Sequence, residues 1–300
     1  MTTISKIPVG ASGRTASRTA RGGSARPSRG TGGPLARLAG TVLVIGFVVP
    51  FLFALSTSLR SPEDVAEHPL ALPFHPTLSN FSRAISAMQY PRSVLNTVVV
   101  TGGSCVLVVV LGAMAGYALG LTTLGWSRWA YRGFMLGMGV PLFVFVAPLY
   151  LLMRDLHLLG TTIGVILIYA AMNLPVAVFF YTSFVRTIPG ELGEAAQLDG
   201  AGRLRTFFAI YLPLLGPVTA TLLVFVTLMV WNDLMIPLIF LQDPDQRTLM
   251  VNAYSLLDER IVRPTDLFPA ALLGMAPLFV LFVLFQRRMV EGMSGGGVKG

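Results

Sequence analysis

The stretch from Leu95 to Leu121, LNTVVVTGGSCVLVVVLGAMAGYALGL, contains no Asp, Glu, Lys or Arg. A helix needs about 20 predominantly apolar residues to cross the hydrocarbon core of a bilayer. This stretch is longer than that, and it lacks the alternation of apolar and polar residues that is typical of a membrane β-strand. It therefore predicts a transmembrane helix, and five other stretches of the chain have the same character.

These six segments together predict an all-α integral membrane protein with six transmembrane helices. Charged residues make up 12% of the chain, whereas soluble domains contain roughly 25%. Gly112, Gly116 and Gly120 recur every four residues, a spacing that lets two helices approach closely, within one subunit or between two. Asp233 is the only charged side chain inside any segment. The predicted helices are approximately residues 38–58, 95–121, 133–153, 161–183, 214–241 and 267–286.

Residues 1–34 differ from the rest, because they are mostly Ser, Thr, Arg and Gly. Such a segment cannot bury enough apolar surface to offset its chain entropy. We interpret it as a disordered, basic, cytoplasmic tail, followed by one transmembrane domain over residues 35–300.

Several function classes are excluded by composition. Cys105 is the only cysteine, which excludes an internal disulfide and a multi-cysteine metal site. Lys6 and Lys299 are the only lysines, and neither follows glycine before Ser or Thr, as a phosphate-binding P-loop requires. The three histidines lack metal-ligand spacing. The chain is therefore expected to hold no metal and to bind no ATP through a Walker motif of its own.

The net charge of +8 is interpreted as a signal of membrane orientation and not of nucleic-acid binding. If the N-terminus is inside, twelve basic residues near the spans fall on the inner side and seven on the outer side. Because cytoplasmic loops carry an excess of Lys and Arg, we expect both termini in the cytoplasm of a multi-pass protein of the cell (inner) membrane.

The connection over residues 186–217 reads RTIPGELGEAAQLDGAGRLRTFFAIYLPLLGP. Glu191 and Glu194 suit the positive end of a helix dipole, and Gly200 can adopt the left-handed backbone that ends a helix. A second short helix over residues 204–211 is expected to lead back to the membrane. The pattern alone predicts a small-faced helix that enters a groove on another protein, or a plain helical hairpin.

The spacing of this connection resembles the EAA loop of ABC importer permeases in every defined position: Glu194-Ala195-Ala196, Gly200 and Ile210-Tyr211-Leu212-Pro213. Its wider form is similar to the carbohydrate-uptake branch of that family. The similarity covers residues 35–300. Supporting stretches are Asn96-Thr97, Tyr117-Ala118-Leu119, Trp231-Asn232-Asp233, Pro237 to Phe240, and the C-terminal residues 291–300, which resemble the tail of the maltose-permease G-type subunit.

This resemblance implies a type I ABC importer permease fold and no enzymatic activity of the chain itself. The loop would couple the chain to a separate ATPase dimer, which would bind the ATP. A second, homologous permease subunit, an extracytoplasmic solute-binding protein and a sugar would complete the system, and residues 295–300 would reach the ATPase. The residues implied for coupling are Glu194, Ala195, Ala196, Asp199, Gly200, Ala201 and Arg203.

Polar side chains within the spans are candidates for the substrate path, because such groups are costly in lipid and usually face the interior. Prolines interrupt several spans, which favours a cleft, with kinked packing helices as the alternative. Asp233 lies near one end of its span and is equally consistent with a structural pairing. The path candidates are Asn173, Trp231, Asn232 and Asp233.

Two other functions were compared with the importer. An ion-coupled secondary transporter could use Asp233, but we find no internal repeat of the kind such transporters carry. A serine enzyme is suggested only by Gly292-Met293-Ser294-Gly295, which lies beyond the last span with no histidine after it, and is discarded. The two outer connections, residues 59–94 and 242–266, are expected to face the solute-binding protein or to be simple connectors.

Overall fold

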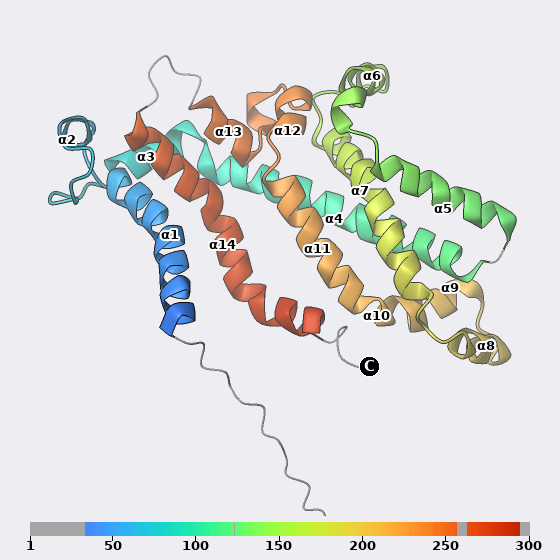
Figure 1. Ribbon diagram of the computed structural model, residues 1–300. Helices are drawn as coiled ribbons and strands as arrows, with labels where there is room; N and C mark the ends of the chain where they lie inside the picture. The colour runs from blue at the N-terminus through green and yellow to red at the C-terminus, as the bar shows by residue number, and fades with distance from the viewer. Residues whose placement is uncertain (1–33, 123, 257–262, 295–300) are drawn as a thin grey trace, which may run out of the picture. The chain divides into compact units, whose positions relative to one another are not determined.

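The computed structural model describes residues 34–122, 124–256 and 263–294, and every regular element in those ranges is a helix (Figure 1). The expected all-α fold is confirmed. The predicted tail over residues 1–34 and the C-terminal residues 295–300 lie outside the described residues, except for Pro34. The longer helices are α1 (Pro34–Ser58), α4 (Tyr90–Leu121), α5 (Gly125–Met138), α6 (Leu142–Asp155), α7 (Thr162–Val185), α11 (Gly216–Trp231) and α14 (Pro264–Ser294).

Short helices occupy the connections. They are α2 (Pro62–Glu67), α3 (Ser79–Ala87), α8 (Glu191–Leu198), α9 (Arg203–Thr206), α10 (Leu212–Leu214), α12 (Met235–Phe240) and α13 (Leu249–Ser255), with a π-helix η1 (Phe207–Tyr211) and a 3-10 helix η2 (Pro244–Gln246). The chain divides into two units at residue 49. In the first unit, the described part is residues 34–49 of α1, whose side chains are exposed from Ala36 onward. All other elements belong to the second unit.

Helices α4 and α7 form the centre of the second unit, and glycines set their close contact. A Cβ atom at Gly112 would lie 2.7 Å from the Cβ of Ala177, and one at Gly120 would lie 2.6 Å from Cγ1 of Val185. Gly116 lies against Tyr181 in the same way. The glycine stripe of α4 therefore packs within the subunit, where it lets the two backbones approach closely.

The predicted helix 133–153 is wrong as one continuous helix. Helix α5 ends at Met138, α6 starts at Leu142, and the two are bent by 107°. Pro141 is the N-cap of α6, and a proline disfavours helical backbone in the residue before it. The proline thus ends one helix and starts another.

The predicted helix 214–241 is also broken. Helix α11 ends at Trp231 and α12 begins at Met235. Between them the Asp233 carboxylate accepts the backbone N–H of Met235 at 2.9 Å and of Ile236 at 3.4 Å. A carboxylate that satisfies the free N–H groups of a first turn starts a new helix. At the other end, α11 is bent by 72° from the segment Arg203–Leu214.

Four helices in the described residues are long and apolar enough to cross a membrane: α1 from Ala36, α4, α7 and α14 up to Leu284. The number rises to six if each of the two bent pairs counts as one span. The sequence located the apolar segments correctly but missed the breaks inside two of them.

The connection that precedes α4 and the connection that follows α12 come together at the N-terminal end of α4. The Asn96 amide donates to the backbone oxygens of Asp245 and Arg247 at 2.9 and 3.0 Å. Arg92 pairs with Asp245 at 2.7 Å, and Arg83 with Asp266 at 3.1 Å. We call α2, α3, η2 and α13 with their linking residues the cap. The opposite end of α4 contacts α9, through Tyr117.

Candidate coupling loop and substrate path

Helix α8 is short but has a well-defined C-terminus. Asp199 is its C-cap and Gly200 follows with φ +78°. The N–H of Ala201 donates to the Ala196 oxygen at 2.9 Å, and the N–H of Gly200 donates to the Gln197 oxygen at 3.0 Å. These two bonds form a Schellman motif, in which a left-handed residue lets the chain satisfy the last carbonyls of the helix. The predicted role of Gly200 as the end of this helix is confirmed.

One face of α8 rests on the helix bundle. Gly193 and Ala196 are buried there, and a Cβ atom at Gly193 would lie 3.0 Å from the Tyr211 hydroxyl oxygen. Tyr211 is itself buried and packs edge-on against the Tyr117 ring of α4, with 4.9 Å between centroids. Small residues on this face therefore seat α8 against a rigid aromatic support.

The opposite face of α8 is exposed. Glu194, Ala195 and Asp199 are solvent-accessible, and Leu198 is 89% exposed. Leu204, in α9, is 66% exposed. The exposed face of α8 therefore combines charged side chains with the apolar Leu198.

The remaining loop residues complete this arrangement. Arg203 is exposed, and its backbone oxygen accepts from the Tyr117 hydroxyl at 3.4 Å. The predicted second helix 204–211 is replaced by α9 and the π-helix η1. Pro213 lacks the N–H that a regular helical turn would use. The structure thus brings the predicted coupling residues into one compact element, with Ala196 on the seated face and Glu194 and Ala195 on the exposed one.

Asp233, a path candidate, is tied to α7. The Tyr169 hydroxyl donates to Asp233 Oδ2 at 2.7 Å, in addition to the two backbone N–H groups of α12. Asn173, one turn after Tyr169, is buried and donates to the Tyr169 oxygen at 2.8 Å. The Asp233 carboxylate thus makes a structural pairing, which holds the break between α11 and α12 against α7.

Trp231 and Asn232 point elsewhere. Trp231 is buried against the cap residues Met88 and Leu249, and its indole N–H donates to the Gly274 oxygen at 3.5 Å. Its ring also lines an almost wholly apolar groove of about 570 Å³ between α4, α11 and α14. Asn232 is exposed and bonds to its own helix. Within the part of the chain that the structure describes, neither residue hydrogen-bonds to Asn173.

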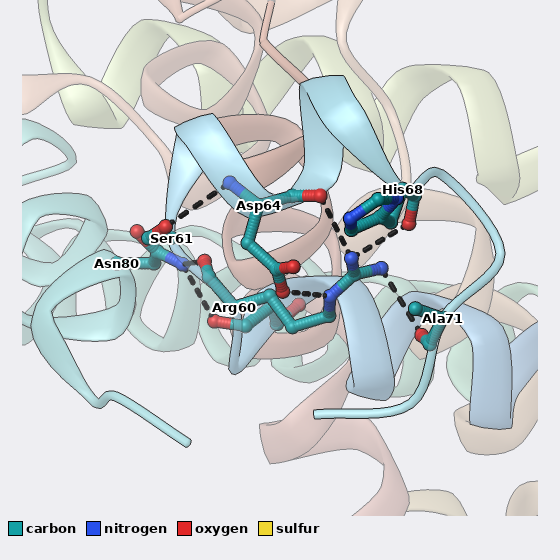
Figure 2. Close-up of polar contacts among 7 residues, drawn as sticks. Arg60, Ser61, Asp64, His68, Ala71 and Asn80 are labelled. Carbon is teal, nitrogen blue, oxygen red and sulfur yellow. Dashed lines mark hydrogen bonds and ion pairs between the residues drawn. The ribbon is translucent and has the colours of Figure 1, made fainter. Parts of the chain in front are cut away.

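Arg60 is not among the sites predicted from the sequence, yet it is only 1% exposed. Figure 2 shows its polar contacts. Its guanidinium donates to Asp64 Oδ2 at 2.5 Å, and to the backbone oxygens of Asp64 at 2.8 Å, His68 at 2.6 Å and Ala71 at 3.0 Å. The Asn80 amide donates to the Arg60 oxygen at 2.7 Å. Arg60 therefore organises the part of the cap that follows α1.

The Arg60 contact also affects ionisation. The hydrogen bond and charge of the guanidinium lower the pKa of the Asp64 carboxyl below its usual value of 3.8, despite a smaller opposing effect of burial. In the sequence only Asp64, four residues later, marks Arg60, because its other partners are backbone oxygens. Only the loop conformation brings them together.

Known transport proteins resemble this chain in sequence. The sequence profile of the family described as "Binding-protein-dependent transport system inner membrane component" matches residues 108–295. The melibiose/raffinose/stachyose import permease protein MelC of Bacillus subtilis is 34% identical over 267 residues, covering 88% of this chain and 95% of the relative. The diacetylchitobiose uptake system permease protein NgcG of Streptomyces coelicolor is 32% identical over 251 residues, covering 83% of each.

A solved structure agrees in fold. A chain of a bacterial ABC transporter involved in the import of the acidic polysaccharide alginate superposes with a TM-score of 0.73, covering 84% of this chain and 94% of that one at 20% identity. The family consists of transport permeases and not of enzymes, as the sequence resemblance implied. This chain therefore belongs to the binding-protein-dependent transport system inner membrane components, the permease family of ABC importers.

Proposed function

We propose that this chain is the permease subunit of an ATP-dependent sugar importer, in which it forms half of the translocation path. The relatives named above are permeases for oligosaccharides, which supports a sugar or a closely related polyol as the substrate. Both termini would lie in the cytoplasm, and the cap would face a solute-binding protein on the other side.

The exposed face of α8 carries this proposal. It would enter a groove on a separate ATPase dimer, which would bind and hydrolyse the ATP. Glu194 and Ala195 would contact the ATPase, with Asp199, Ala201 and Arg203 at the rim. Ala196 and Gly200 would act by seating and ending the helix, since one is buried and the other has a left-handed backbone. Residues 295–300, outside the described residues, would lie near the same interface.

The conformational change of the transmembrane helices would begin at this loop. Because α8 rests on Tyr211 and Tyr211 on Tyr117 of α4, a push on α8 would act on the central pair α4 and α7. A second, homologous permease subunit would form the other half of the path. Among the candidate path residues, Asn173 would lie on the path, since it is buried near the middle of α7. Asp233, in the break between α11 and α12, would hold this break in position beside the path.

The test is reconstitution in proteoliposomes. This chain, with a companion permease, an ATPase and a binding protein from one operon, should take up raffinose or diacetylchitobiose only when ATP is inside. Two variants separate loss of docking from a general effect of added charge. Ala195→Arg adds a charge to the exposed face of α8, and Ser183→Arg adds the same charge at an exposed position of α7 outside the loop. Ala195→Arg should abolish both uptake and ATPase capture.

An ion-coupled transporter that uses Asp233 is the alternative. In that case this chain alone would drive uptake with a proton or sodium gradient, and Asp233→Asn would remove the ion dependence. Uptake without ATPase, or full transport by Ala195→Arg, would overturn the importer proposal.

A further inference from the structure

A second cavity lies apart from α8 and from Asp233, where α1 ends and α14 begins. Its volume is about 690 Å³. Phe53 of α1 and Phe268 of α14 form part of its wall and meet edge-to-face, with 5.8 Å between ring centroids. Helix α2 contributes the remaining side. A cavity of this size is in the range of small-molecule sites.

Two hydroxyl-bearing side chains line the cavity from within. Thr57 and Thr265 are each 1% exposed. The Thr265 Oγ1 is buried and has no hydrogen-bond partner among the described residues. Thr265 is the second residue of α14, so its helix offers no earlier carbonyl to accept the hydroxyl proton. Buried polar atoms without partners are rare in folded proteins, and this one points to an occupant that supplies the missing bond.

The cavity also carries one acid and one base. Glu63 of α2 and Arg263, directly before α14, both line it. Neither forms an ion pair with another described residue, although Glu63 has local hydrogen bonds, including one with Ser61, and its pKa is lowered by these and, more weakly, by the charge of Arg263. The first turn of α14 adds the positive end of a helix dipole on the side of Arg263 and Thr265. An occupant that satisfies both sides must bear a negative and a positive group.

The position of the cavity selects among such molecules. Helices α1 and α14 are both apolar enough to cross a membrane, and the cavity lies where the apolar segment of α1 ends and that of α14 begins. Phe53 is partly accessible there, next to the exposed apolar residues Phe51, Leu52 and Leu55. This is the depth of lipid head groups, where aromatic and basic residues anchor membrane proteins.

We propose that this cavity binds the head group of a zwitterionic phospholipid of the phosphatidylethanolamine type. Its phosphate would lie against Arg263 and the Thr265 hydroxyl, and its ammonium group against Glu63. The acyl chains would follow the apolar residues of α1. A neutral sugar would use the threonines but would bring no charged group to either Glu63 or Arg263.

The test uses the full-length chain, delipidated in detergent, and native mass spectrometry with dihexanoyl-phosphatidylethanolamine. Arg263→Gln should weaken binding about tenfold, the effect of one charge-assisted hydrogen bond, and Thr265→Val a few-fold. Arg154→Gln, an exposed arginine paired with Asp155 outside the cavity, should leave binding unchanged. Thermal unfolding of each variant checks that the fold is retained.

Two further ligands make the result specific. Dihexanoyl-phosphatidylglycerol lacks the ammonium group and should bind about tenfold more weakly, a preference that Glu63→Gln should remove. Glycerophosphoethanolamine, which has no acyl chains, should bind more weakly than the lipid. Equal binding of the two lipids, equal binding of the chain-free analogue, or binding of raffinose that Arg263→Gln abolishes would each overturn the proposal.

Discussion

Replacing Gly200 by valine isolates the role of the turn that ends α8. A Cβ atom at Gly200 meets nothing within 4 Å, so the substitution creates no clash with a neighbour. The entire effect comes from the backbone, whose φ is +78°. A left-handed conformation costs an L-residue about 1–2 kcal/mol, with β-branched side chains at the unfavourable end.

That cost acts on the Schellman motif and hence on the orientation of α8. A penalty of 1–2 kcal/mol lowers the population of the native turn about 5- to 30-fold relative to alternatives. Under the proposed function, capture of the ATPase by Gly200→Val should fall by a similar factor, and ATP-driven uptake should fall with it. Membrane insertion and the thermal stability of the α4–α7 pair should not change.

The chain supplies matched controls for this prediction. Gly202 lies two residues later with φ −68° and has equally open surroundings, so Gly202→Val adds the same side chain without backbone strain. Gly200→Asn tests the opposite case, because asparagine tolerates the left-handed region. Capture is measured by co-purification of the ATPase and uptake in proteoliposomes. If Gly200→Val and Gly202→Val behave alike, the turn is not what positions the coupling helix.

Three further predictions concern the bundle and the cap. In thermal unfolding, Tyr169→Phe should destabilise the protein by about 1.5–3 kcal/mol, the value of a hydrogen bond to a charged group. Tyr150→Phe is the control and should have little effect, because the Tyr150 hydroxyl accepts from the exposed, uncharged Gln242 amide; equal effects would contradict the role of the Asp233 contact. Gly116→Ala should destabilise the protein by about 1–3 kcal/mol in thermal unfolding, through overpacking against Tyr181. Gly102→Ala, with open space around it, should stabilise the protein by up to about 1 kcal/mol through helix propensity. A stabilised Gly116→Ala variant would show that the α4–α7 contact is loose. The folded state lowers the pKa of Asp64, so the stability that this carboxylate adds to the cap is complete above the ordinary value of 3.8 and is lost as pH falls through the lower folded value. The hydrogen-exchange rate of residues 61–78 should therefore rise only below that ordinary value. Asp64→Asn should raise the same exchange rate already at neutral pH.

The sequence predicted the positions of the apolar segments, because hydropathy depends on composition over about 20 residues and not on detailed contacts. It also predicted the end of α8, since a left-handed position strongly favours glycine. The break at Pro141 was not predicted. A proline inside a span is tolerated when neighbouring groups satisfy the freed backbone, so the residue alone does not distinguish a kink from a break.

The contacts of Asp233 and Arg60 show where sequence reasoning stops. Asp233 is a costly residue in an apolar segment under either interpretation, and its partner Tyr169, more than sixty residues earlier, is found only in the folded chain. Arg60 is an ordinary loop arginine in the sequence, and its partners are backbone oxygens whose positions depend on the folded loop. The fold of the cap likewise depends on pairs such as Asn96 and Arg247, which no periodicity links.

Helix α4 runs without interruption for 32 residues, a length of about 48 Å at 1.5 Å per residue. Its glycine stripe fixes its C-terminal third to α7, while the predicted spans over α5–α6 and α11–α12 are broken. Because a continuous helix has no break at which it can hinge, we expect a displacement of its Tyr117 end to be transmitted to Asn96. A ligand that immobilises the cap is then expected to restrain α8 as well, which hydrogen exchange of residues 191–201 would detect.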